Sequence, residues 1–151
     1  MAALDTRLTN AINGGALVSD FKFNLLQTTY TTNFGNNSAS SQTATQIGWR
    51  SSYPVQGVTR TYATVNGVKS SAAKPAKLYY NITNAGYSAT LIMYVNGIQV
   101  ASGFGSYAVD ISQIVSQNPN VTVSFVAKDT SGDGGRWCTV NISDVRISNA
   151  G

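Results

Sequence analysis

Short segments in which apolar and polar residues alternate recur along this chain, and turn-forming residues separate them. Phe21–Leu25 places Phe21, Phe23 and Leu25 on one face, and Val121–Ala127 alternates in the same way. A period of two residues is typical of strands with one buried face. About eight or nine such segments, with at most two short helical turns, predict an all-β fold of the sandwich or jelly-roll type.

Two Asn-Gly pairs predict β-hairpins. Asn96-Gly97 lies between Leu91–Val95 and Ile98–Val100, which are rich in β-branched and aromatic residues. A two-residue type I′ turn needs positive φ at both central positions, and Asn-Gly supplies them. Asn66-Gly67 is a weaker candidate, because the sequence that follows it becomes loop-like.

Two further patterns complete the expected β body. Gly35–Gln46 contains only small polar residues and alanine, which predicts a long surface loop. Trp137–Ile147 predicts a long last strand. Earlier in the chain, Asp110 or Ser112 could cap a single helical turn. The apolar positions of this strand change phase near Ser143-Asp144, so we expect a β-bulge there.

The N-terminal residues have a helical period instead. Leu4, Leu8 and Ile12 recur at the spacing of one helix face, and Asn13-Gly14-Gly15 provides a stop. A helix this short is marginal in isolation, so it needs a packing partner. The sequence predicts a helical arm over residues 1–15 and a single jelly-roll domain over 16–151. The partner of Leu4, Leu8 and Ile12 is either this domain or another subunit.

Composition narrows the chemistry. Charged residues make up 11% of the chain, the net charge is +4, and there is no Glu and no His. A Ser-His-Asp triad is therefore impossible, and a glycosidase would have to place two Asp carboxylates. The basic residues form no run, which argues against nucleic acid, and no stretch reaches the roughly 20 apolar residues of a membrane span. Cys138 is the only cysteine and is expected to be buried.

The stretch Leu91–Phe125 resembles the galactose-binding-domain-like jelly roll, best known as the sugar-binding domain of family 2 glycosidases. The matching residues are Tyr94-Val95-Asn96-Gly97, then Tyr107-x-Val109-Asp110-Ile111-Ser112, then Asn120-Val121-x-Val123-x-Phe125. The resemblance covers about a quarter of the chain and implies a β-sandwich scaffold. In that family these positions are structural, so it implies little about function.

Asp129, Ser131 and Asp133, followed by Gly134, imitate the first half of a calcium loop. The bidentate acidic residue of the second half is missing, because Val140 stands in its place. A plain loop is therefore the favoured interpretation, and no cofactor is expected. If a metal bound here, Ca²⁺ would be the candidate, since the ligands are all oxygen.

Exposed aromatic side chains with polar neighbours are what sugar binding needs, whereas sandwich cores also use aromatics. The best candidate is Trp137, beside Arg136 and the Asp129–Gly135 loop, and Trp49 and Tyr53 are further candidates. Tyr62, Tyr79 and Tyr87 are candidates on the same grounds.

The preferred function from sequence is that of a non-enzymatic virion protein. Few charges, an arm-like N-terminus and a body rich in Ser, Thr, Asn and Gly are similar in style to bacteriophage head-decoration (cement) and fibre proteins. This interpretation predicts a homo-oligomer, most simply a trimer, that docks on a major capsid or other virion protein. Residues 1–6 lack the features of a signal peptide, which predicts synthesis in the host cytoplasm. The alternative is a carbohydrate-binding module or receptor-binding fibre domain with a glycan as partner.

Overall fold

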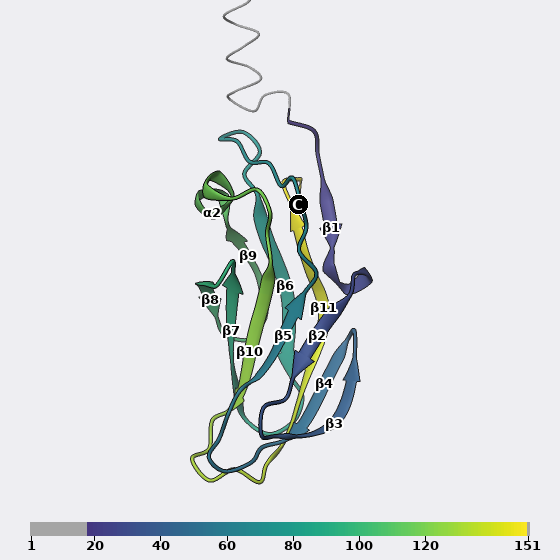
Figure 1. The fold of residues 1–151 in the computed structure, drawn as a ribbon, viewed down its shortest axis with the longest axis vertical. Helices are drawn as coiled ribbons and strands as arrows, with labels where there is room; N and C mark the ends of the chain where they lie inside the picture. The colour runs from purple at the N-terminus through teal and green to yellow at the C-terminus, as the bar shows by residue number, and fades with distance from the viewer. Residues whose placement is uncertain (1–17, 151) are drawn as a thin grey trace, which may run out of the picture.

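Two antiparallel β-sheets face each other in the computed structural model, which describes residues 18–150 (Figure 1). Sheet A has the order β3 (Ser38–Thr43), β4 (Gln46–Arg50), β11 (Trp137–Ser148), β6 (Lys77–Asn84) and β9 (Gly105–Asp110), with β1 (Lys22–Asn24) pairing beside β11. Sheet B has the order β2 (Tyr30–Asn33), β5 (Val58–Tyr62), β10 (Val123–Asp129), β7 (Ala89–Val95) and β8 (Ile98–Ser102). The predicted β-sandwich is confirmed.

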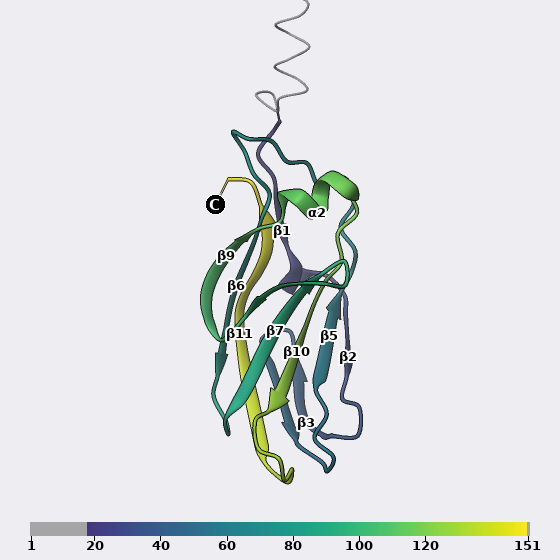
Figure 2. The same cartoon turned by 90° about the vertical axis from the view of Figure 1, so that its left-hand side faces the viewer.

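The core fills the space between the two sheets, which Figure 2 shows edge-on as two layers. Alternation along each strand decides which side chains enter it. On β6, Leu78, Tyr80 and Ile82 are buried, whereas the residues between them are half-buried on the outer face. Cys138 is buried as expected. Burial, with a smaller contribution from the charge of Asp129, raises the pKa of its thiol to about 11.

The Asn96-Gly97 hairpin is present between β7 and β8. Asn96 has φ 51° and Gly97 has φ 78°, as a turn of this kind requires. The Asn96 side chain also reaches the neighbouring connection, where its Oδ1 accepts a hydrogen bond from the Thr122 amide at 2.8 Å. The turn is therefore joined to the start of β10 as well as to its own strands.

The predicted bulge in β11 is also present, because the register with β6 shifts between Ile142 and Asp144. The shift lets Val140 and Ile142 before it, and Val145 after it, all point into the core. A single strand can then run the full length of sheet A, from Trp137 to Ser148.

The prediction of a loop over Gly35–Gln46 is wrong in part, since it contains β3. This strand lies at the edge of sheet A and pairs only with β4, so most of its side chains are exposed. An edge strand without a buried face has no reason to alternate, and its sequence therefore resembles a loop.

The second predicted hairpin, at Asn66-Gly67, is absent from the described residues. Val65 forms an isolated bridge with Val121, and the Val68 amide donates to the Pro119 carbonyl at 2.9 Å. Both residues are buried. The apolar pattern here marks a segment that closes one end of the core against a distant loop, and its Asn-Gly pair does not return the chain onto itself.

Arg60 on β5 is fully buried and links the two sheets. Its burial was not expected from the sequence, because the residue is charged. Its Nε donates to Thr32 Oγ1 at 2.9 Å, and its Nη1 donates to the Thr43 carbonyl of sheet A at 2.8 Å. Its guanidinium also lies 4.0 Å from the ring centroid of Tyr30. Burial lowers the pKa of Arg60 and raises the pKa of the adjacent Tyr62 to about 12.

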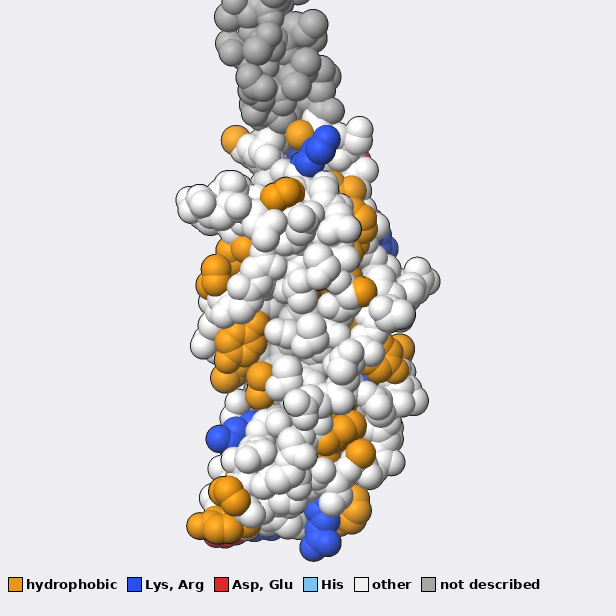
Figure 3. Space-filling view, in the orientation of Figure 1, with side chains coloured by type: hydrophobic (Ala, Val, Ile, Leu, Met, Phe, Trp, Pro, Cys, Tyr) orange, Lys and Arg blue, Asp and Glu red, His pale blue; other side chains and the backbone are white. Residues whose placement is uncertain are grey.

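Two short helical segments are found among the described residues, η1 (Leu25–Gln27) and α2 (Ser112–Gln117), and neither is long enough to cross a membrane. Asp110 Oδ1 accepts a hydrogen bond from the Ser112 amide at 2.9 Å, just before α2. Hydrogen bonds from Ser112 hold the pKa of the Asp110 carboxyl below its usual value. Figure 3 shows the face formed by sheet B, where charged side chains are few and hydrophobic side chains form scattered small patches.

Candidate functional site

Trp137 opens β11 at one end of the sandwich and is 61% exposed, although the next residue, Cys138, is buried. The alternation of the strand places its side chain on the outer face of sheet A. Its register partner on β4 is Arg50, whose guanidinium carbon lies 5.8 Å from the indole ring centroid. The exposed indole therefore has a cation beside it on a neighbouring strand.

A second cation–aromatic pair adjoins the first. The Arg136 guanidinium carbon lies 4.4 Å from the ring centroid of Tyr87, which is 45% exposed. The Tyr87 amide donates to the Trp137 carbonyl at 3.0 Å, so the two segments run side by side. We call Arg50, Tyr87, Arg136 and Trp137 the loop-end cluster, because the β4–β5, β6–β7 and β10–β11 connections meet here (Figure 1).

Neither arginine of the loop-end cluster forms an ion pair with a described residue. No described carboxylate pairs with their hydrogen-bond donors, which are thus available to a ligand, while their guanidinium carbons lie over aromatic rings. The neighbouring carboxylates are Asp129, the buried last residue of β10, and Asp133, which is exposed in the β10–β11 loop.

Ser51 and Asp129 fix the backbone beneath the cluster. Ser51 Oγ donates to Asp129 Oδ2 at 2.5 Å and accepts from the Arg136 amide at 3.0 Å. The backbones of Ser51 and Arg136 are also paired, since the Ser51 amide donates to the Arg136 carbonyl at 2.8 Å. This network ties the residue before Trp137 to the end of β4, which positions the indole before any ligand arrives.

The Asp129 carboxylate is satisfied within the protein. Besides the bond from Ser51, it accepts the Ser131 amide on Oδ1 and the Ser131 hydroxyl on Oδ2, each at 2.9 Å. Burial by itself would raise the pKa of Asp129, but these hydrogen bonds and the charge of Arg136 outweigh it and hold the pKa below its usual value. Asp129 is therefore ionised at neutral pH.

The same network bears on the predicted calcium ligands Asp129, Ser131 and Asp133. Asp129 and Ser131 are bonded to each other, and Asp133 is exposed in the loop beyond them. Within residues 18–150 there is no cluster of three or more acidic or cysteine side chains that could hold a metal ion. The Asp129 carboxylate therefore holds this loop against Ser51.

Gly134 brings the β10–β11 loop against the β4–β5 loop. It has φ 72°, and a Cβ there would lie 2.8 Å from the carbonyl carbon and oxygen of Ser52. Only glycine permits both this conformation and this approach. Tyr53, the residue after Ser52, is 76% exposed and is joined to Pro54 by a cis peptide bond.

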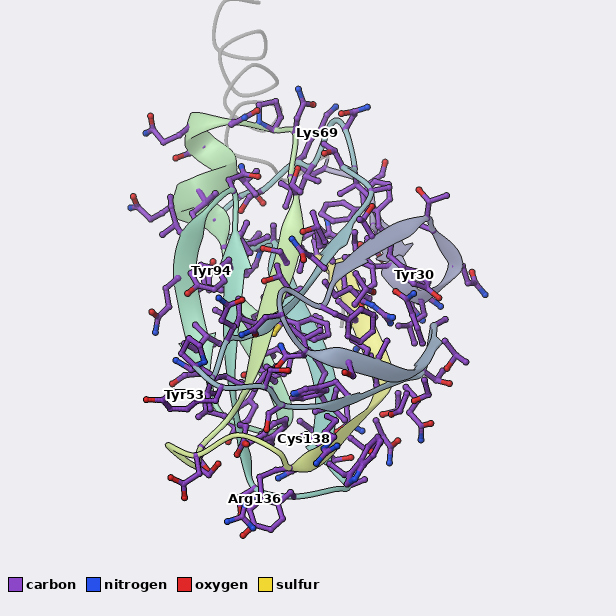
Figure 4. The ribbon with its side chains drawn as sticks, turned by 60° about the horizontal axis from the view of Figure 1, so that its bottom comes forward. Tyr30, Tyr53, Lys69, Tyr94, Arg136 and Cys138 are labelled. Atoms are coloured by element: carbon purple, nitrogen blue, oxygen red, sulfur yellow. The ribbon has the colours of Figure 1, made fainter. Side chains whose placement is uncertain are left out.

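Of the four predicted sugar-binding residues, Arg136 and Trp137 are neighbours in sequence that contact different partners, Tyr87 and Arg50. Tyr53 is 76% exposed in the adjoining loop, and Figure 4 shows it at the left of the view, apart from Arg136 at the bottom. Among the described residues it makes no aromatic contact with Trp137. The prediction that Trp49 binds sugar is wrong, because its side chain is fully buried in the core and offers no surface to a ligand. It alternates with Gly48 and Arg50, and this pattern already marked Trp49 as inward-facing.

Arg50 and Ser51 were not anticipated as site residues. They follow an apolar segment, and no sequence motif surrounds them. The β4–β11 register places Arg50 beside Trp137, and Ser51 contacts residues more than 75 positions away in sequence. Tyr62, considered earlier, is buried, and Tyr79 is half-buried on the outer face of sheet A. The predicted assembly contacts Leu4, Leu8 and Ile12 lie outside the described residues.

No family model matches the chain, and no curated protein sequence is similar to it. Among solved structures, the fold is similar to the CBM36-1 domain of a multidomain xylanase from the hindgut metagenome of Trinervitermes trinervoides. The identity is 14%, the alignment covers 88% of this chain and 99% of that chain, and the TM-score is 0.46. At this level of similarity nothing about that domain's binding follows for the present chain.

Proposed function

We propose that this protein is a non-enzymatic carbohydrate-binding module with a galactose-binding-domain-like jelly roll, and that the loop-end cluster contacts the glycan. The observation that carries the proposal is the exposure of Trp137, which is 61%. This residue begins β11, and hydrogen bonds of Ser51 to Asp129 and Arg136 fix the backbone just before it. A preorganised aromatic surface loses little conformational entropy when a ligand stacks on it.

The chemistry of the cluster suits a sugar. Pyranose rings have apolar C–H faces that pack on aromatic side chains and equatorial hydroxyls that accept hydrogen bonds. Trp137 and Tyr87 supply rings, and Arg50 and Arg136 supply donors that no described carboxylate occupies. An arginine fork can reach two neighbouring hydroxyl oxygens at once.

The non-enzymatic part of the proposal rests on the carboxylates. The chain has no Glu, and a glycosidase needs two carboxyl groups facing one bond. Asp129 is occupied by Ser51 and Ser131, and Asp144 pairs with Arg146. Both groups are thus committed to structural contacts.

The test is a glycan array with the full chain, followed by calorimetry on the glycans that bind. Trp137→Ala is expected to weaken binding at least tenfold, because loss of one stacked aromatic removes about 1.5 kcal/mol or more. Ile98→Ala is the matched control, since Ile98 is a 54% exposed hydrophobic residue outside the cluster. Absence of any glycan ligand, or equal binding by wild type and the Trp137 variant, contradicts the proposal.

Assembly on a virion, with docking through residues 1–15 and a trimeric state, stays a prediction from sequence. Its test is light scattering on the full chain and on a variant that lacks residues 1–15. A monomeric full chain would contradict the oligomer, and unchanged assembly after the deletion would contradict the role of Leu4, Leu8 and Ile12.

A further inference from the structure

The outer face of sheet A connects the loop-end cluster to a second aromatic region at the far end of β11. On β4, β11 and β6 the outward side chains between these ends alternate with buried ones. Those outward side chains are uncharged and polar. We call them the polar track: Gln46, Asn81, Thr83, Thr139, Asn141 and Ser143.

Cross-strand hydrogen bonds hold the polar track in place. Gln46 Nε2 donates to Asn141 Oδ1 at 3.1 Å, and Gln46 Oε1 accepts from Ser41 Oγ of β3 at 3.3 Å. Asn81 Nδ2 bonds to Ser143 Oγ further along. Each amide still has donor or acceptor capacity left after these contacts, and all of them stand on strands, which position side chains more precisely than loops do.

The far end of the polar track is a hollow of about 550 Å³ on the outer side of β6, β9 and β11. The outward aromatic ring there is that of Tyr79, which is half-buried. The ring of Tyr107 lies on the other face of the sheet, beside that of its register partner Tyr80, with 5.4 Å between the two ring centroids. The Arg146 guanidinium lies 4.1 Å from the ring centroid of Tyr79 and pairs with Asp144. The hollow thus combines aromatic and polar side chains, as the loop-end cluster does.

The length of the polar track indicates a polymer. Trp137 is at the first position of β11, and Arg146, the register partner of Tyr79, is near its last. Since a strand rises about 3.3 Å per residue, roughly 25–30 Å separates the two aromatic ends. A single sugar cannot touch both, whereas a chain of several units can.

The charge of the track decides which polymer fits. No Lys or Arg lies between Arg50 at one end and the Asp144–Arg146 pair at the other, so a polyanion such as nucleic acid would find no row of cations. The track also lacks the large apolar side chains that dominate protein–protein hot spots. Neutral amides and hydroxyls instead match a neutral ligand that carries many hydroxyls.

We propose that the outer face of sheet A, from Trp137 to the hollow at Tyr79, is the binding track for a linear, uncharged polysaccharide lying along β11. The inference rests on the proposed carbohydrate-binding function and specifies its substrate class. The aromatic ends stack on sugar rings, and the polar track hydrogen-bonds the hydroxyls between them. The protein therefore binds the interior of a chain and needs no chain terminus.

The experiment is calorimetry with cello-, xylo-, manno- and malto-oligosaccharides of increasing length, from the disaccharide upward. For the series that binds, affinity is expected to rise with length until the chain spans both ends and then to level off. Gains of at least tenfold between the shortest and the longest ligands are expected, because new contacts are added without a second loss of translational freedom.

Variants separate the two ends of the track. Tyr79→Ala is expected to weaken long oligosaccharides roughly tenfold and to leave the shortest ones unchanged, whereas Trp137→Ala weakens both. Asn141→Ala, at an exposed position in the middle, should reduce long-chain affinity with little effect on folding. Tyr94→Ala on the outer face of sheet B is the matched control, and thermal unfolding verifies that each variant is folded.

The outcomes distinguish this inference from the function on which it rests. If short and long ligands bind equally and only Trp137→Ala matters, the polar track is wrong and the loop-end site stands. If no oligosaccharide or glycan of any length binds, the proposed function fails and the track fails with it. Preference for charged chains over neutral ones overturns the substrate class.

Discussion

The Asn96-Gly97 hairpin and the loop end both turn the chain through a glycine with positive φ, but they are held in different ways. Gly97 has φ 78°, and a Cβ added there would meet no atom within 4 Å. Gly134 has φ 72°, and a Cβ there would lie 2.8 Å from the backbone of Ser52. The first turn is open to solvent, while the second is pressed against another loop.

The difference shows where the molecule places its exposed aromatic. The hairpin returns β7 onto β8, which is its neighbour in sequence. The loop end depends on Ser51 bonding to Asp129, 78 residues away, and to Arg136, 85 residues away. The position of Trp137 is therefore a product of long-range contacts, and variants at the two turns should behave differently.

The largest difference is expected from Asp129→Ala. This change leaves Ser51 and Ser131 without their acceptor in a buried site, and we expect a loss of about 3 kcal/mol in the free energy of unfolding. Asp110→Ala is the matched control, because Asp110 also accepts the amide of the serine two residues on but is exposed. It should lose about 1 kcal/mol. Urea unfolding measures both, and equal losses would contradict the importance of the Ser51 contact.

The two glycines provide the next comparison. Gly97→Ala adds only the strain of a left-handed residue, about 1 kcal/mol, whereas Gly134→Ala adds the displacement of Ser52 and is expected to reach about 2–3 kcal/mol. Gly134→Ala should also weaken glycan binding, since it moves the support of Arg136 and Trp137. Urea unfolding and calorimetry of both variants check this, and a smaller loss for Gly134→Ala than for Gly97→Ala would be a clear contradiction.

Acid should remove the contribution of Asp129. Its pKa in the folded protein is lower than the ordinary value of 3.8, so the folded state favours the ionised form. The resulting stability is complete above the unfolded-state pKa and is lost as the pH falls through the lower, folded-state pKa. The stability difference between wild type and Asp129→Asn should therefore be constant near neutral pH and shrink below 3.8. A difference that grows in acid would contradict the assigned direction.

The smallest effect concerns reactivity alone. Because burial raises the pKa of Cys138 to about 11, its thiol should not react with a disulfide reagent at about pH 8 in the folded protein. Asp129→Asn should speed the reaction by opening the loop end next to Cys138, while Gly97→Ala should leave the rate near that of wild type. Equal reaction rates of the Cys138 thiol in Asp129→Asn and Gly97→Ala would contradict this expectation, because the two ends of the sandwich would then open together.

Much of the fold could be predicted, because its strands carry their own signals. The β7–β8 hairpin, the alternation of β10 and the bulge in β11 were each visible in a few consecutive residues. Strand β3 was missed because an edge strand with most of its side chains exposed has no alternation to detect. The Asn66-Gly67 pair misled because nothing local shows that Val65 and Val68 pack against the distant Val121–Pro119 segment.

The candidate site was predictable only in part. Trp137 and Arg136 were predicted from their place beside a loop and stay predictions as ligand contacts, whereas Trp49 was grouped with them although it is buried. Arg50, Ser51 and the polar track could not be assigned, since register decides which residues of β4, β6 and β11 stand side by side. The assembly contacts expected at Leu4, Leu8 and Ile12 lie outside the described residues and stay predictions.

The sequence by itself determined the elements: the period-two alternation, the Asn96-Gly97 turn and the scarcity of charge define an all-β chain with a polar surface that carries few charges. These properties depend on residues a few positions apart. The tertiary structure alone decided that Arg50 lies beside Trp137, that Asp129 holds Ser51, and that one face carries a polar track between two aromatic ends. Those contacts join residues far apart in sequence, and only the pairing of strands brings them within bonding distance.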